Sequence, residues 1–299
     1  MSDKGELKDE KRNGQGKMTF LDGRVYEGAF KDEQFNGHGK MTFPHGRVYE
    51  GEFKDGKRNG QGKMTFLDGR VYEGAFKDEQ RNGHGKMTFP NGTVYEGEFK
   101  DGKSNGQGKM TFLDDRVYEG AFKDEQPNGQ GKGTSMNSNV YEGEFKDGKS
   151  NGQGKITSPN GIVYEGEFKD RKISDQVKIT FPDGRVYKGK HNGETANGHG
   201  EMTFPDGRVY KGEFKNGIVN SNSYGQMTFA DGRVYEGEWK NNEHNGYGKM
   251  TLPDGTVQNG EWKNGKFKDQ NKKRKVDNPS LNDRQLKAVE LAKKLRHSS

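Results

Sequence analysis

The sequence lacks cysteine entirely, and it also lacks any long hydrophobic run. Without thiols there is no disulfide framework, no cysteine nucleophile and no cysteine-ligated zinc or iron–sulfur site. No stretch approaches the roughly 18 consecutive apolar residues that span a membrane. Residues 1–12 are charged rather than apolar, unlike a secretory signal. These absences lead us to expect a soluble, cytoplasmic protein.

Hydrophobic residues are scarce as well. Only 26% of the 299 residues are hydrophobic and 32% are charged, which is too little apolar material for one large core. Composition of this kind is typical of disordered chains. We nevertheless expect a folded protein, because aromatic residues recur at fixed intervals and a disordered chain needs no such spacing.

Positive charge is concentrated at the C-terminal end. The net charge is +6, yet residues 1–262 are close to neutral and the excess lies in 263–299. The densest cluster consists of Lys272, Lys273, Arg274 and Lys275. A cluster at 272–276 is consistent with a nuclear-import signal, with a contact to acidic phospholipid or with solubilising charge. The sequence leaves these three alternatives open.

The chain is rich in one short motif, V-Y-x-G. Its copies place tyrosine at Tyr26, Tyr49, Tyr72, Tyr95, Tyr118, Tyr141, Tyr164, Tyr187, Tyr210 and Tyr235, and a degenerate copy carries Gln258. Almost all successive copies are 23 residues apart. A period in this range indicates a repeat architecture, in which each unit packs mainly on its neighbours.

A second period is twice as long. Residues 23–68 and 69–114 differ at only four positions. The exchanges are Phe35/Arg81, His45/Asn91, Arg47/Thr93 and Arg58/Ser104. The segment that was copied is therefore a pair of repeats.

Each repeat has the pattern of two short strands. Residues 39–43 and 47–54 are rich in threonine, valine, tyrosine and phenylalanine, which is typical of strands. Residues 44–46 and 55–60 are rich in glycine, proline, asparagine and aspartate, which is typical of turns. The alternation of side chains along each strand then predicts the register.

The shorter connection predicts a three-residue loop that ends on a left-handed glycine. Such a loop would pair Met41 with Tyr49 and Gly39 with Gly51, so that the apolar side chains share one face. The turn glycines expected at this position are Gly46, Gly69, Gly92, Gly184, Gly207, Gly232 and Gly255.

The wider connection permits a second pairing of the same parity. Tyr49 would then face Phe66, and Gly51 would face Met64. By the same register Phe53 would face Gly62. We therefore expect large side chains to lie opposite glycines across this connection.

These features predict an all-β fold, an elongated single-layer antiparallel β-meander of about eleven repeats. On its polar face Lys40 would oppose Glu50, an exposed pair that contributes only ~0.2–1 kcal/mol. With two strands per repeat and ~4.8 Å between strands, the meander would form a rod roughly 100 Å long. A single sheet must curl or be covered by another molecule to bury its apolar face.

The pattern Y-E-G-E-F-K-D-G-K-x-N-G-x-G-K-M-T-F-x-D-G resembles the MORN repeat (membrane occupation and recognition nexus) over nearly all of residues 13–263. The resemblance implies a twisted, grooved sheet. It also implies a scaffold or docking surface in cytoskeletal, ciliary or membrane-associated complexes. MORN arrays accompany catalytic domains in some lipid kinases and methyltransferases, but the array leaves no room for one here, so we expect no enzyme.

We expect four segments along the chain. These are a charged segment at 1–12, the repeat array at 13–263, a basic linker at 264–279 and a short amphipathic α-helix at 280–297. Ser280 and Asp283 form the capping box of that helix. The array is expected to be irregular between 133 and 225, where Ser135 and Ser158 replace phenylalanine and His191 stands in an aromatic position.

No motif in the array predicts chemistry. The segment 60–65, GQGKMT, has Met64 where a phosphate loop needs serine or threonine, and a strand follows it instead of a helix. His38, His84 and His199 alternate with glutamine in other copies, which indicates solvated positions rather than metal ligands. We therefore expect no catalytic residues, no metal and no cofactor.

The aromatic face is the candidate binding surface, a groove for a helix or peptide of a protein partner. Its residues are Tyr26, Tyr49, Phe53, Tyr72, Phe76, Tyr95, Phe99, Tyr118, Tyr141, Tyr164, Tyr187, Tyr210, Tyr235, Trp239 and Trp262. The same side chains would stabilise the sheet by stacking on their cross-strand neighbours. A purely structural role and an added docking role are both open.

The first hypothesis for function is a non-enzymatic scaffold that binds protein partners along this groove in a cytoskeletal or membrane-associated assembly. The alternative is a membrane-proximal adaptor that binds acidic phospholipids, including phosphoinositides, through 272–275. A homodimer is a further option, and nuclear import through 272–276 is another. No nucleic acid is expected on the array.

Overall fold

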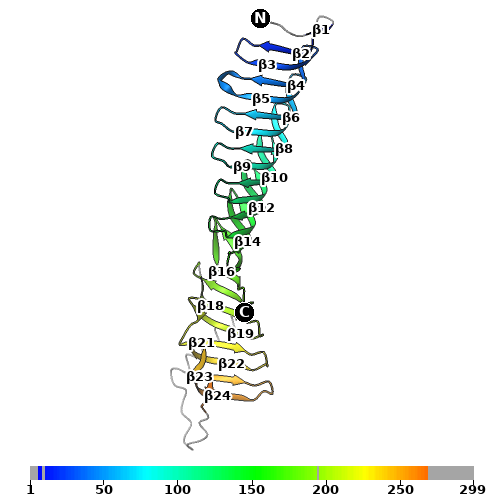
Figure 1. Cartoon of the computed structure of the whole chain (residues 1–299). Coiled ribbons are helices and arrows are strands. Elements are labelled where there is room, and N and C mark those ends of the chain that lie inside the picture. Colours follow the sequence, from blue (N-terminus) through cyan, green and yellow to red (C-terminus); the bar gives the residue numbers. More distant parts are fainter. Residues whose placement is uncertain (1–5, 9–10, 194, 269–299) are drawn as a thin grey trace, which may run out of the picture. The chain divides into compact units, whose positions relative to one another are not determined.

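The computed structural model describes residues 6–8, 11–193 and 195–268 (Figure 1). The chain divides into two compact units, Met1–Gly154 and Lys155–Ser299, and each is described by itself. The basic cluster at 272–276 and the helix expected at 280–297 lie outside the described residues.

Unit 1 is a series of antiparallel strands. They are β1 (Glu6–Lys8), β2 (Lys11–Thr19), β3 (Val25–Lys31), β4 (Gln34–Thr42), β5 (Val48–Lys54), β6 (Lys57–Thr65), β7 (Val71–Lys77), β8 (Gln80–Thr88), β9 (Val94–Lys100), β10 (Lys103–Thr111), β11 (Val117–Lys123), β12 (Gln126–Thr134) and β13 (Val140–Lys146). β14 (Lys149–Thr157) runs across the boundary between the units. From β1 to β13 each strand pairs with the next along the chain, as the meander predicts.

Unit 2 repeats the arrangement. Its strands are β15 (Val163–Lys169), β16 (Lys172–Thr180), β17 (Val186–His191), β18 (Ala196–Thr203), β19 (Val209–Lys215), β20 (Ile218–Val219), β21 (Ser223–Thr228), β22 (Val234–Lys240), β23 (Glu243–Thr251), β24 (Val257–Lys263) and β25 (Lys266–Phe267). β19 pairs with both β20 and β21, so the two extra residues of this repeat lie in the connection between them. Both units are all-β, and no α-helix occurs in the described part of the chain.

The three-residue loops confirm the predicted register. Between β4 and β5 the amide of Phe43 donates to the Arg47 carbonyl at 2.8 Å, and Met41 pairs with Tyr49. The loop contains the short 3-10 turn η1 (Pro44–Gly46). All seven predicted turn glycines have positive φ, as Gly46 does at 96°. Glycine is favoured here because a side chain would be strained in this backbone conformation.

The wider connection is shorter than the sequence predicted. Asp55 and Gly56, with φ of 51° and 78°, make a two-residue turn, and Lys54 pairs with Lys57. Two successive residues with positive φ are typical of the hairpin turn that matches strand twist. The strand starts at once after this turn, so residues 57–60 belong to β6 and not to a loop.

The expected pairing across this connection is therefore wrong by two residues. Tyr49 faces Met64 instead of Phe66, and Gly51 faces Gly62 instead of Met64. Beyond the glycines the register shifts again, because β6 has a bulge at Gly60, whose φ is 95°. The parity of the prediction holds, since a shift of two leaves every side chain on its face.

Phe53 consequently faces Arg58. The sequence had predicted Gly62 at this place. Glycine thus faces glycine at the centre of the strand pairs, except in those that β16 forms. Near the tight turn, the strand aromatic residue faces a residue that varies between repeats.

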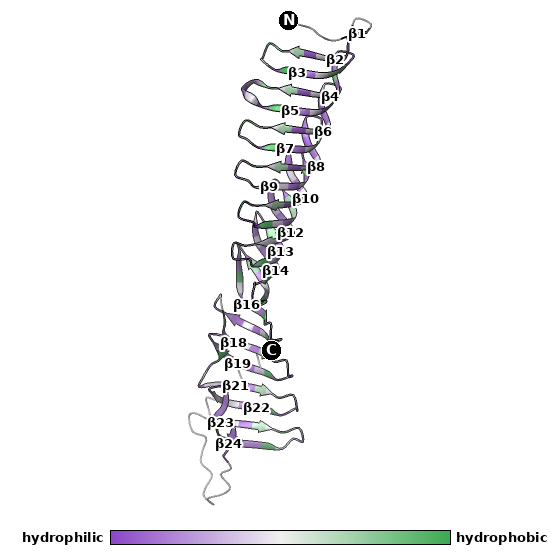
Figure 2. Ribbon diagram, in the orientation of Figure 1, coloured by the Kyte–Doolittle hydropathy of each residue, from purple (hydrophilic) through white to green (hydrophobic). Residues whose placement is uncertain are grey.

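The polar face carries the expected ladder of lysine and glutamate. Lys40 pairs with Glu50 in the strand register, and Lys86 contacts Glu96 at 2.9 Å one pair of repeats later. Both partners of the Lys86 pair are about half exposed, so each contact adds only ~0.2–1 kcal/mol. Figure 2 shows hydrophilic residues along much of the strands, broken by short apolar stretches.

The apolar face is the core of each unit. In unit 1 the buried cluster runs from Tyr26 to Phe122, and in unit 2 it runs from Val177 to Trp262. Apart from Tyr164, the repeated tyrosines lie over the pair of glycines beside them. A Cβ placed on Gly62 would lie 2.5 Å from the Tyr49 ring, and one on Gly51 would lie 2.4 Å from the Gly62 Cα. The core therefore depends on two residues without side chains.

The range expected to be irregular keeps its strands. β16 lacks the N-G-x-G sequence, yet it forms nine residues of strand in which Val177 faces Gly166 and Ile173 faces Phe168. Both β16 side chains turn to the apolar face, where each belongs to or packs on the buried cluster. The boundary between the units, at Gly154 and Lys155, falls inside this range.

Replacing one of the paired glycines should destabilise the fold. Gly62→Ala places a methyl group within 2.7 Å of three Tyr49 atoms, and overpacking of this kind costs about 1–3 kcal/mol. Gly133→Ala is the matched control, since its Cβ would lie 3.4 Å from Phe145, an ordinary contact. We expect urea denaturation to show a loss for Gly62→Ala alone. Equal stability of the two variants would contradict the role of the glycine pair.

Candidate functional site

The structure places the predicted groove residues in the interior. Tyr26, Tyr49, Tyr72, Tyr187, Tyr210 and Tyr235 are 0% exposed, Tyr95 is 1%, Tyr118 is 5% and Tyr141 is 9%. Phe53, Phe76, Phe99, Trp239 and Trp262 are 3–4% exposed, and Tyr164 is partly buried. Their part in binding stays a prediction. An accessible surface has to be formed mainly by other side chains.

Most of the repeated tyrosines are fixed at both ends, by a hydroxyl hydrogen bond and by neighbouring rings. The Tyr72 hydroxyl donates to the Ala75 carbonyl at 2.8 Å, and its ring meets the edges of Phe76 and Phe99 with centroids 5.2 and 4.9 Å away. Burial of the hydroxyl raises the pKa of Tyr72 to about 12. The same arrangement of hydroxyl and two rings recurs at Tyr95. It stabilises the sheet without a second layer.

One position covers the open side of each tyrosine, and sequence reasoning missed it. This cover position is the residue that faces the strand phenylalanine or tryptophan, or His191 in one repeat, across the tight turn. Its occupants are Phe35, Arg58, Arg81, Ser104, Pro127, Ile173, Ala196, Val219, His244 and Phe267. Two of the four differences between 23–68 and 69–114 fall on it, which was the available signal.

Planar groups at the cover position lie against the tyrosine ring. Phe35 stacks on Tyr26 with centroids 4.0 Å apart, and His244 stacks on Tyr235 at the same distance. Arg58 lies 5.7 Å from the centre of the Tyr49 ring, a cation–π contact. The cover position thus completes the core with a residue that changes from repeat to repeat.

Arg58 is also held by a carboxylate from the next hairpin. Its Nε donates to Glu79 Oε2 at 2.7 Å, its amide donates to Oε1 at 2.6 Å, and its terminal nitrogen donates to the Glu79 carbonyl at 3.0 Å. Arg81, one repeat later, meets Gly102 instead and donates to its carbonyl. Carboxylate and glycine alternate here because the copied segment is a pair of repeats.

The interior is open at Ser104. A cavity of about 230 Å³ lies there, lined by aromatic and methionine side chains and by three charged groups. The lining residues are Arg70, Arg81, Met87, Phe89, Tyr95, Phe99, Ser104, Met110 and Glu125. The small Ser104 side chain stands where Arg58 closes the equivalent site.

The three-residue loops form a second accessible feature, the loop edge of unit 1. All the strongly exposed large hydrophobic residues in the described part of this unit lie on it. They are Leu21, Leu67, Leu113 and Met136, with exposures of 103, 73, 78 and 79%. Each is the second residue after a strand: the leucines follow a half-buried phenylalanine, and Met136 follows the exposed Ser135.

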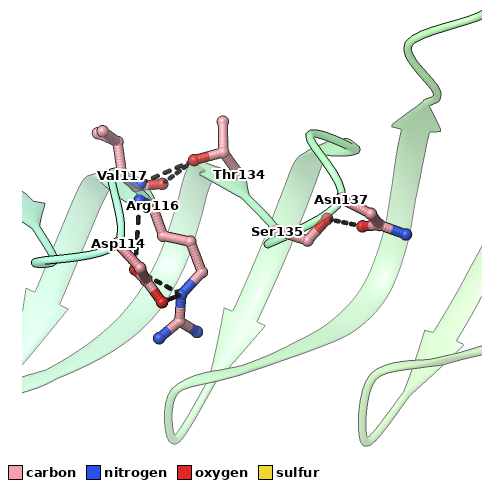
Figure 3. A network of polar contacts seen from close by, with 6 residues as sticks. All are labelled: Asp114, Arg116, Val117, Thr134, Ser135 and Asn137. Atoms are coloured by element: carbon pink, nitrogen blue, oxygen red, sulfur yellow. Dashed lines mark hydrogen bonds and ion pairs between the residues drawn. The ribbon is translucent and has the colours of Figure 1, made fainter.

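Charged pairs stiffen these loops. Arg116 Nε donates to both oxygens of Asp114, at 3.0 and 2.9 Å (Figure 3). The Arg116 guanidinium also lies 4.9 Å from the Phe112 ring. One repeat later Ser135 replaces the phenylalanine and bonds Asn137 instead. The carboxylate bonds lower the pKa of Asp114. The exposed leucines are therefore presented on ordered loops.

The structure supports no metal site among the residues it describes. No group of three or more histidine, aspartate or glutamate side chains in 11–193 and 195–268 is close enough to hold an ion. His38, His84 and His199 are exposed, as predicted. None of the described segments is a helix long and apolar enough to cross a membrane. Lys272, Lys273, Arg274 and Lys275 lie outside those segments, so contacts through them stay predictions.

Comparison with family models matches the MORN repeat in nine segments. They are residues 4–23, 26–46, 49–69, 72–94, 95–114, 118–137, 141–163, 196–207 and 235–257, more than half of the chain. The chain belongs to the MORN-repeat family. The expected family is confirmed, and no catalytic domain family was found. A comparison with curated protein sequences gave no significant match.

Comparison with solved structures gave matches at low identity and low TM-score. The TCP10 domain of Danio rerio CPAP is 16% identical, over 82% of this chain and 99% of that chain, with a TM-score of 0.38. The TCP domain of SAS-4 from Drosophila melanogaster, solved with a proline-rich motif of Ana2, is 12% identical, over 67% and 89%, with a TM-score of 0.32. Virginiamycin B lyase from Staphylococcus aureus reaches 11%, over 87% and 88%, with a TM-score of 0.14. These similarities are too weak to indicate function.

The buried tyrosines make the array sensitive to alkali. Because burial raises the pKa of Tyr72 from 10.0 to about 12, the unfolded state loses its phenolic proton first. Stability is full below pH 10 and falls as pH rises toward 12, by about 1 kcal/mol per pH unit for each such tyrosine. Tyr72→Phe should reduce this slope, and it should cost about 1 kcal/mol at neutral pH by removing the hydroxyl bond.

Urea denaturation between pH 8 and pH 11.5 measures the slope, and absorbance of tyrosinate reports ionisation. Tyr247→Phe, at a residue that is 37% exposed, is the control and should leave the slope unchanged. Tyrosinate that forms near pH 10 in the folded native chain and is missing from folded Tyr72→Phe would rule the explanation out.

Unit 2 should lose stability in acid through His244. Burial lowers the pKa of His244 from 6.5 to about 4, so the unfolded state takes up a proton first as pH falls. The contribution is complete above pH 6.5 and is lost as pH falls toward 4. Trp239 and Trp262, the only two tryptophans, lie 4.7 and 5.6 Å from the histidine ring. Their fluorescence therefore reports unfolding of this unit.

His244→Phe supplies the ring that Phe35 places on Tyr26 in unit 1. We expect denaturation midpoints of this variant to be independent of pH between 4 and 6.5, unlike those of the native chain. An unchanged acid dependence would assign the effect to other groups.

Proposed function

We propose that this MORN-repeat protein is a non-enzymatic scaffold that binds protein partners through the loop edge and the adjoining groove of unit 1. The single observation that carries the proposal is the row of leucines at Leu21, Leu67 and Leu113, which are 73–103% exposed. Exposed apolar side chains that are aligned, rather than scattered, are typical of protein interaction sites.

The row has a regular spacing. Its leucines recur at every second repeat, and proline takes the same loop position in between, at Pro44 and Pro90. Neighbouring loops touch, since a Cβ on Gly69 would lie 3.3 Å from Pro90 and one on Gly92 would lie 3.0 Å from Leu113. Four strands at ~4.8 Å separate one leucine from the next, or roughly 19 Å. A partner with apolar side chains at that interval would match it.

The groove beside the loops supplies selectivity. Half-buried Phe66 and Phe89 form its wall on the loop side, and arginine side chains from the cover position form the other. Aromatic and arginine side chains carry much of the binding energy at protein interfaces. Loop leucines and groove arginines together offer a partner both apolar and polar contacts.

The test compares proximity labelling in cells by the tagged native chain and by two triple variants. Leu21→Ser, Leu67→Ser and Leu113→Ser together should remove specific labelled proteins, because they take away the apolar row without disturbing the buried core. The matched control changes Lys17, Lys63 and Lys109 to serine on the polar face, at the same spacing of repeats.

Urea denaturation of both triple variants shows whether each remains as stable as the native chain. The loop-edge proposal is supported if labelled proteins are lost with the triple leucine variant and retained with the triple lysine variant. An identical labelled set for all three chains, or a loss with the lysine variant only, would refute it.

A further inference from the structure

Two cover positions in unit 1 have equivalent surroundings and different occupants. At the first, Arg58 lies 6.0, 5.7 and 5.8 Å from the ring centres of Phe43, Tyr49 and Phe76. Its guanidinium donates to Glu79. Only 15% of the Arg58 side chain is exposed. This site is closed by an arginine that is surrounded by aromatic rings and bound by a carboxylate.

The second site lies two repeats further along the chain. The sequence keeps every partner, with Phe89, Tyr95 and Phe122 as the rings and Glu125 as the carboxylate, but the cover residue is Ser104. The Tyr95 and Phe122 rings keep the same edge contact, with centroids 4.8 Å apart. The amide of Glu125 donates to the Ser104 carbonyl at 3.0 Å, as that of Glu79 donates to Arg58. The surroundings of an arginine are therefore built without the arginine.

The missing side chain leaves room. The cavity at Ser104 measures about 230 Å³, far more than the about 10–15 Å³ that one water needs. Phe89 and Met110 contribute apolar walls, and Glu125 borders the cavity with a carboxylate. The Glu125 carboxylate interacts with the charge of Arg81 across the cavity. No hydrogen bond to its side chain from a described residue is present, whereas Glu79 binds Arg58 directly.

The other charges at the cavity are compatible with a cation. Arg70 is paired with Asp68 at 2.8 Å, which offsets its charge. Arg81 is occupied with the Gly102 carbonyl. Arginine already stands at two successive cover positions, Arg58 and Arg81, so the array tolerates a guanidinium beside Arg81.

We propose that the cavity at Ser104 binds an arginine side chain of a protein partner. The guanidinium takes the place that Arg58 takes in its own site, over Tyr95 and between Phe89 and Phe122, and it donates to Glu125. Arginine suits this environment better than lysine, because its planar guanidinium stacks on aromatic rings and is less strongly hydrated. This inference rests on the proposed function, since it names one side chain of the partner.

Methyl NMR of the full chain tests the site, because Met87 and Met110 line the cavity. Chains with labelled methionine methyl groups are titrated with three blocked tripeptides that carry arginine, lysine or citrulline between two glycines. We expect saturable shifts of Met87 and Met110 with the arginine peptide, about fivefold weaker binding with lysine and none with neutral citrulline. Met41 and Met64, at the site that Arg58 fills, are internal controls and should not shift.

Three variants make the result specific. Ser104→Arg fills the cavity from within the chain and should abolish the shifts. Glu125→Gln removes the charge and should weaken binding about fivefold. Arg58→Ser opens the equivalent site and should transfer saturable shifts to Met41 and Met64 as well. Denaturation curves confirm that each variant is folded.

The inference is overturned if the arginine peptide produces no saturable shift at Met87 and Met110. It is overturned equally by shifts that survive Ser104→Arg or that citrulline reproduces, because the cavity would then take an apolar or amide group. Failure here leaves the loop-edge proposal standing, since the peptides do not involve Leu21, Leu67 or Leu113. Loss of the loop-edge proposal would likewise leave peptide binding at Ser104 measurable.

Discussion

The contact of one tyrosine ring with two facing glycines is the constraint on which the rest of the structure depends. Tyr49 occupies the volume that side chains on Gly51 and Gly62 would fill, and its hydroxyl ends on the Glu52 carbonyl at 2.8 Å. The backbone itself thus becomes one wall of the core. A chain with only 26% hydrophobic residues can then bury its aromatic side chains in a single layer. Each tyrosine ring packs against glycine backbone, so no second side chain is needed to fill the space opposite it.

The sequence was sufficient to predict the strand register across the three-residue loop, which permits one register. It was not sufficient across the wider connection, which permits two. Gly46 closes a three-residue loop, and this loop permits only the register that pairs Met41 with Tyr49. The wider connection contains two glycines, Gly56 and Gly60, and both have positive φ. Gly56 lies in the turn, and Gly60 lies in the bulge of β6. Both are glycines with flexible backbones, so the sequence alone could not show which of them forms the turn.

The candidate site shows a similar division. Periodicity alone was enough to place the tyrosines on one apolar face, while their part in binding stays a prediction. Their burial depends on cover residues that only the folded hairpins bring near. Arg58 and Ser104 were visible as two of the differences between the copied segments. Their meaning was not, because it requires the contact with Glu79 or Glu125 from the following hairpin. Recognition in this array is therefore to be sought where copies differ.

The near identity of the copied segments also affects how the chain reaches its fold. A hairpin displaced by one pair of repeats meets the same glycines, the same tyrosine and the same loop, so most contacts of a wrongly paired intermediate equal those of the correct one. Phe35, Arg58, Arg81 and Ser104 are among the few residues that differ between such alternatives. Besides any part in binding, they give the correct order of hairpins a lower free energy than its displaced counterparts.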